Sequence, residues 1–201
     1  MKPLSLIIAF LPLIAFSLLA RLLPHNDIGV AGLVAAVIAL IALAISRPVW
    51  PPKILTALSL VLFTVLAILG FTLGHNDDRW LDTWGGAGIG LVIGLIIVAV
   101  IPIMPFTEQF AREGVPESAW GSPTFKKINL VLSAAWGAAI FAAGAARVAA
   151  AAINGHTTRR LPELLLGLAV PVVIIIYMLK FSKSYPDRVT HQQPARAPAG
   201  R

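Results

Sequence analysis

The chain has 201 residues, of which 58% are hydrophobic and only 12% are charged, and its formal net charge is +7. A soluble globular domain carries about 25% charged residues, so this composition excludes an ordinary water-soluble fold and favours membrane helices. The chain contains no cysteine, which excludes disulfides, thiolate metal sites and cysteine nucleophiles.

Long uncharged apolar runs begin almost at once, and a membrane-spanning helix needs about 20 such residues. The first run, 4–23, follows Lys2 and contains Pro12. It is similar to a signal peptide, but no small-x-small cleavage site follows it. We therefore expect a retained first helix, which either crosses the membrane or only enters it. The second and third runs, 28–45 and 54–73, are separated by the proline-rich stretch SRPVWPP.

Three more apolar runs follow, at 85–103, 125–153 and 162–179. The fifth run begins after Ser122-Pro123, a favourable N-cap and first-turn pair. Residues 1–181 are therefore predicted to form one all-α polytopic transmembrane bundle of about six hydrophobic segments. Residues 182–201 are polar and rich in proline, which predicts a disordered tail that contacts anionic lipid.

The basic residues predict the orientation of this bundle. If six segments cross the membrane with the N-terminus inside, eleven of the sixteen basic residues lie inside and four lie outside. The outside four are Arg21, Arg79, Arg159 and Arg160, and Arg147 lies within the fifth segment. By the positive-inside rule, both termini and residues 104–124 are expected in the cytoplasm.

A polar stretch, PFTEQFAREGVPESAWGSPTF, interrupts the apolar sequence at residues 105–125. Phe106 and Phe110 lie at i,i+4 spacing, as do Glu108 and Arg112, and both pairs favour a short helix over about 106–114. This pattern resembles an interfacial helix that lies flat on the membrane. It is either an anchored loop or a functional segment, namely a docking surface or a re-entrant lid. Its predicted partner or lipid contacts are Phe106, Phe110, Arg112, Glu113 and Trp120.

Small residues recur every four positions in two segments. They are Gly86, Gly90 and Gly94 in the fourth segment, and Ala138, Ala142, Ala146 and Ala150 in the fifth. Such ridges let helix backbones approach closely in a membrane. Packing within one molecule is the first interpretation, and a homodimer seam is the alternative.

The tripeptide His-Asn-Asp occurs twice, between the first and second segments and again after the third. Its imidazoles and carboxylates, on His25, Asp27, His75 and Asp77, are ordinary metal ligands. The alternative, which we favour, is that these residues form turns and cap helices. We therefore predict no metal centre.

Asn129 and Arg147 are the candidate functional polar residues within the fifth segment. A charge at the centre of a bilayer is costly and is a candidate functional residue. Arg147 lies near the end of a long apolar stretch, so it either snorkels to the outer interface or contributes to a polar cavity. The sequence contains no nucleophile elbow and no phosphate-binding loop, and we predict no enzymatic activity, no cofactor and no nucleic-acid partner.

Four short stretches resemble the family of intracellular septation protein A, also called inner membrane-spanning protein YciB. They are FLPLIAF (10–16), LGFTLGHND (69–77), SPTFKKINLVLSAAW (122–136) and AGAARV (143–148). The chain is similar to a divergent member, because Arg147 stands where the family has asparagine and the link at 106–120 is more elaborate. The resemblance implies a place in the bacterial inner membrane and a part in septation, cell division and envelope maintenance, through contacts with other inner-membrane proteins. The alternative prediction is a small transporter or lipid-handling protein with a polar cavity near Arg147.

Overall fold

The computed structural model describes residues 3–23, 28–45, 53–73, 84–154 and 165–191. Every regular element in these ranges is helical. In chain order they are α1 (Pro3–Leu22), α2 (Ile28–Ile45), α3 (Ile54–Thr72), α5 (Gly86–Val100), α6 (Phe106–Ala111), η2 (Glu117–Ala119), α7 (Pro123–Asn154), η3 (Leu165–Ala169) and α9 (Val170–His191). The prediction of an all-α fold is confirmed for this part of the chain.

Four helical stretches are long and apolar enough to cross a membrane: Ile28–Ile45, Ile54–Thr72, Pro123–Ile153 and Leu165–Thr190. Two shorter apolar stretches, Ile7–Ala20 and Ala87–Val100, belong to α1 and α5. The structure therefore indicates a membrane protein. The finer prediction, six crossing segments, stays a prediction.

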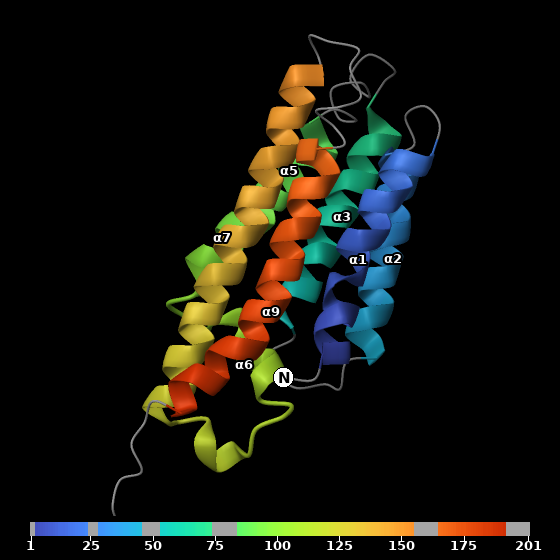
Figure 1. The fold of residues 1–201 in the computed structure, drawn as a ribbon. Helices are drawn as coiled ribbons and strands as arrows, with labels where there is room; N and C mark the ends of the chain where they lie inside the picture. Colours follow the sequence, from blue (N-terminus) through green and yellow to red (C-terminus); the bar gives the residue numbers. More distant parts are fainter. Residues whose placement is uncertain (1–2, 24–27, 46–52, 74–83, 155–164, 192–201) are drawn as a thin grey trace, which may run out of the picture.

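The long helices lie side by side in one bundle (Figure 1). The helix α2 packs along α3 and against α1, while α7 packs along α5 on one side and along α9 on another. The short helix α6 lies at one end of this bundle, beside the starts of α1, α3 and α7 (Figure 1). We call this the α6 end of the bundle.

Glycines set the two closest helix contacts. A Cβ added to Gly70 of α3 would lie 2.5 Å from the Cα of Gly29 on α2, and one added to Gly90 of α5 would lie 2.8 Å from the Cα of Gly144 on α7. Neither position has room for a side chain, so these backbones touch directly, as membrane helices do at small residues.

The predicted packing of the fourth segment within one molecule is confirmed for Gly90 and Gly94, which lie against α7. The predicted alanine ridge on α7 is not the surface they meet. Gly94 lies against Phe141 and Gly90 against Gly144, whereas Ala138 and Ala142 are exposed. Ala138 and Ala142 point away from α5 because they lie about 100° around the helix from Gly137 and Phe141, whereas Ala150, further along the ridge, is buried.

The prediction of a disordered tail from residue 182 is wrong for residues 182–191, which continue α9 as helix. Aromatic rings at i,i+4 spacing stabilise this part: the centroids of Tyr177 and Phe181 lie 6.4 Å apart, and those of Phe181 and Tyr185 lie 5.2 Å apart. The indole N–H of Trp136 on α7 also donates to the Ser182 hydroxyl at 2.8 Å. Residues 192–201 lie outside the described part of the chain.

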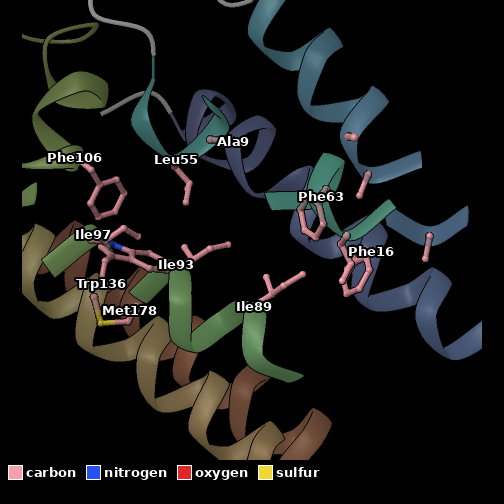
Figure 2. Packing of buried hydrophobic residues seen from close by; sticks show 14 of the residues in the cluster. Ala9, Phe16, Leu55, Phe63, Ile89, Ile93, Ile97, Phe106, Trp136 and Met178 are labelled. Atoms are coloured by element: carbon pink, nitrogen blue, oxygen red, sulfur yellow. The ribbon is translucent and has the colours of Figure 1, made fainter. Parts of the chain in front are cut away.

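The buried core runs the length of the bundle and is rich in aromatic rings (Figure 2). Phe16 of α1 and Phe63 of α3 lie 4.9 Å apart between their ring centroids, and Phe10 and Trp136 lie 5.1 Å apart. Near the α6 end, Phe106 joins the cluster that holds Leu55, Ile97 and Trp136 (Figure 2). The core therefore extends beyond the long helices into α6.

Candidate functional site

The α6 segment, residues 105–122, joins α5 to α7 and contains α6 and η2. Both phenylalanines of α6 point into the bundle, since Phe106 is 1% exposed and Phe110 is 0% exposed. The prediction that these two side chains contact lipid or a partner is therefore wrong. The physical reason is that the i,i+4 apolar face of α6 covers the core instead of the bilayer. Burying each ring contributes about 1.5–3 kcal/mol.

Thr107 connects α6 to α7 through a buried hydrogen-bond network. Its backbone N–H donates to the Ser133 hydroxyl at 3.1 Å, which satisfies one of the free donors at the start of α6. Its own hydroxyl lies 2.9 Å from both the Asn129 carbonyl oxygen and the Ser133 hydroxyl. The Asn129 side chain in turn donates to the Phe125 carbonyl at 2.9 Å. All three polar side chains are buried, so each has the partner that burial requires.

Gln109 connects α6 to α3. Its side-chain oxygen accepts a hydrogen bond from the backbone N–H of Ile54, the first residue of α3, at 2.9 Å. Lys53 occupies the N-cap position of α3, and its side chain forms no capping hydrogen bond. An amide from α6 therefore supplies the acceptor that the start of α3 lacks.

Glu113 and Lys53 form an ion pair at 2.7 Å, with side chains 28% and 15% exposed. The Lys53 ammonium also lies 5.1 Å from the centroid of the buried Phe110 ring, which is within cation–π range. The Ser5 hydroxyl of α1 donates to the other oxygen of Glu113. One carboxylate at the end of α6 thus ties α1 and α3 to the same segment.

Arg112 and Trp120 contact each other across the exposed part of the α6 segment. The Arg112 guanidinium pairs with Glu108, with Nε 3.1 Å from the carboxylate oxygen, and lies 4.8 Å from the Trp120 ring centroid. The Trp120 indole donates to the Val115 carbonyl at 2.9 Å. The predicted Glu108–Arg112 pair is confirmed.

These contacts leave an exposed turn at residues 113–121. Its exposed residues are Glu113, Gly114, Pro116, Glu117, Ser118 and Gly121. Glu113 and Trp120, predicted as contact residues, hold the two ends of this turn through the partners described above. The turn is therefore a fixed surface between two anchors.

Asn129 and Trp136, seven residues apart on α7, both face the bundle interior and are 1% and 2% exposed. Arg147 is half-buried near the other end of α7. Because Gly90 lies against Gly144 and Gly94 against Phe141, the antiparallel register sets Arg147 beside the first turn of α5. This level is at the end of the bundle away from α6, and snorkelling of Arg147 to the interface stays a prediction. A polar cavity near Arg147 stays a prediction.

The four predicted low-priority metal ligands, His25, Asp27, His75 and Asp77, lie outside the described residues. Within the described ranges, no group of three or more histidine, aspartate or glutamate side chains is placed to hold a metal ion.

Sequence reasoning missed the partners that hold α6 in place: Ser5, Lys53, Gln109 and Ser133. One signal was available, because Asn129 and Ser133 form an i,i+4 polar pair within an apolar segment and such pairs mark a buried polar contact. The partner of that pair lies 22 to 26 residues away, a distance that no local spacing predicts.

The chain matches no protein-family model, and searches of curated proteins and of solved structures found no similar protein. The resemblance to the septation-protein family therefore stays a prediction from the four short stretches.

Proposed function

We propose that this chain is a multi-pass protein of a bacterial inner membrane that acts without catalysis, by binding other inner-membrane proteins of cell division or envelope synthesis. The proposal is supported by the resemblance of residues 10–16, 69–77, 122–136 and 143–148 to a septation-protein family. It is also supported by one structural observation, the fixed exposed turn of the α6 segment.

The turn has the properties of a docking surface. Buried contacts to α3 and α7 hold α6, and the pairs Lys53–Glu113 and Trp120–Val115 hold the residues beside it. A turn that is already ordered loses little conformational entropy when a partner binds, and this preorganisation raises affinity. The contact surface is therefore Glu117, Ser118 and their exposed neighbours, rather than the phenylalanines of α6.

Site-specific photo-crosslinking tests this function in living cells. A photoreactive amino acid at Ser118 is expected to capture a defined membrane protein of division or envelope synthesis, identified by mass spectrometry. The matched control places the same amino acid at Val61, which is 59% exposed on α3 and lies in a candidate membrane span.

Two outcomes decide the proposal. Capture of a division or envelope protein at Ser118 and not at Val61 supports it. The docking role of the turn is wrong if the variant with the photoreactive amino acid at Ser118 is functional but captures no protein. It is also wrong if the Ser118 and Val61 variants capture the same proteins.

A further inference from the structure

A second exposed surface runs along α9 from Val173 to Lys183. Val173, Ile176, Lys180 and Lys183 recur at spacings of three and four residues, so they lie on one face of the helix. Val173 is 64% exposed and Ile176 is 49% exposed, and both lie in a candidate membrane span. Along this one face the side chains therefore change from lipid-compatible to basic between Ile176 and Lys180.

The opposite face of α9 shows that this orientation is fixed. Met178 is 4% exposed in the core, and Ser182 accepts the hydrogen bond from Trp136 of α7. These contacts hold the inward face, so Lys180 and Lys183 point away from the bundle and are exposed. The ion pairs within the described part of the chain, Lys53–Glu113 and Arg112–Glu108, involve neither lysine.

An aromatic ladder runs beside the two lysines. Tyr177, Phe181 and Tyr185 stack at i,i+4 spacing, and Tyr177 is 67% exposed. Tyrosine is enriched at the membrane–water boundary because its ring is apolar and its hydroxyl is polar. Tyr177, the first ring of the ladder, lies at the same level as the change from Ile176 to Lys180.

We propose that this part of α9 binds the headgroups of anionic phospholipids in the leaflet at the α6 end. Lys180 and Lys183 supply the charge, Tyr177 lies at the boundary between acyl chains and headgroups, and the acyl chains lie along Val173 and Ile176. Lys180 and Lys183 follow Val173 and Ile176 along the same exposed face of α9. The basic side chains therefore lie at the bilayer surface, where the acyl chains end and the headgroups begin. Asp187 continues the stripe and Arg188 follows it, which leaves a net charge of two for the four charged residues 180, 183, 187 and 188.

The test measures lipid retention by the full chain, purified in a neutral detergent. Phosphatidylglycerol or phosphatidylcholine with identical acyl chains is added at equal concentration, and the bound lipid is counted by native mass spectrometry. The native chain is expected to retain phosphatidylglycerol preferentially. The Lys180→Gln/Lys183→Gln variant is expected to lose about twentyfold in affinity for it, since each cation near an anionic surface strengthens binding about fivefold.

Two matched variants separate a site from general charge attraction. Lys126→Gln/Lys127→Gln removes the same charge from two exposed lysines at the start of α7 and is expected to change affinity less than threefold, within the scatter of a distant surface charge. Lys180→Arg/Lys183→Arg keeps the charge and is expected to keep the binding, provided that α9 folds normally.

Three results would overturn the proposal. They are equal losses in the two glutamine variants, equal retention of the two lipids by the native chain, and displacement of bound phosphatidylglycerol by excess inorganic phosphate, which would indicate a free-phosphate site. If the glutamine variant misfolds by circular dichroism, loss of binding in the arginine variant is the result that contradicts the proposal.

Discussion

The α6 segment and the C-terminal half of α9 are the two polar stretches at the same end of the bundle, and they are held differently. In α6, two phenylalanines at i,i+4 spacing point inward and are buried. In α9, three aromatic rings at the same spacing stack along a partly exposed face. Aromatic spacing at i,i+4 therefore predicts a helix, but it does not predict whether the rings are buried in the bundle or exposed.

Polar partners explain the difference. Three helices provide hydrogen-bond partners for the α6 segment. These are the Ser133 hydroxyl on α7, the Ile54 N–H on α3 and the Ser5 hydroxyl on α1. The C-terminal half of α9 has one such contact, between Ser182 and Trp136. A buried polar group must have a partner, so the helix α6, which has several partners, can be buried in the bundle, while the turn that follows it is exposed.

The largest expected effect comes from the ring at the centre of α6. Phe110→Ala is expected to lower the free energy of unfolding by about 3–5 kcal/mol, because the change leaves a cavity in the core. The measurement is unfolding by a denaturing detergent in mixed micelles. The control, Phe71→Ala, removes a ring that is 59% exposed, and its expected effect is within about 0.5 kcal/mol. Equal effects at the two positions would contradict the inward orientation of α6.

The next largest effect concerns the hydroxyl of Thr107. Thr107→Val keeps the shape but removes the partner of Asn129 and Ser133, and it is expected to cost about 1–3 kcal/mol of unfolding free energy. Thr72→Val is the matched control, since the exposed Thr72 hydroxyl bonds only within its own helix. A Thr107→Val variant as stable as the Thr72→Val variant would show that the network does not stabilise α6.

A smaller effect is expected for the ion pair that joins α3 to α6. Lys53→Met and Glu113→Gln, measured singly and together, are expected to give a coupling energy of about 0.5–1 kcal/mol, because both side chains are partly exposed. The coupling is expected to fall at high salt, since exposed pairs are screened. A coupling energy of zero at low salt would show that this ion pair does not stabilise the contact between α3 and α6.

The smallest effect on stability is expected in α9. Lys180→Gln/Lys183→Gln is expected to change the free energy of unfolding in neutral detergent by no more than about 0.5 kcal/mol, because both side chains are exposed. The same unfolding assay checks this. A large loss of stability would mean that these lysines hold the fold, contrary to the contrast between α6 and α9.

Much of the helical framework follows from the sequence. The predicted segment 28–45 coincides with α2, and 54–73 exceeds α3 by one residue, because prolines and polar residues flank these apolar runs closely. The helix of the fifth segment, α7, begins at Pro123, and the Ser122 hydroxyl oxygen accepts a hydrogen bond from the Phe125 N–H at 3.2 Å. Local signals of this kind are enough to predict helices.

The candidate site was predicted less well, because its contacts join distant parts of the sequence. The partners Gln109 and Ile54 are 55 residues apart, and Ser5 and Glu113 are 108 apart. The helix α6 was predicted, but its pattern of Phe106 and Phe110 fits a membrane surface as well as a bundle core. Only the tertiary structure distinguishes the two.

The central claim, that α6 is folded into the bundle and presents a fixed exposed turn, is tested most directly by cysteine accessibility. The chain has no cysteine of its own, so single introduced residues report without background. Ala111 is 7% exposed and Ser118 is exposed. A membrane-impermeant maleimide is expected to label Ser118→Cys rapidly in membranes where that side is open to the reagent, and to label Ala111→Cys only after denaturation. Equally rapid labelling at both positions in the native protein would contradict the claim.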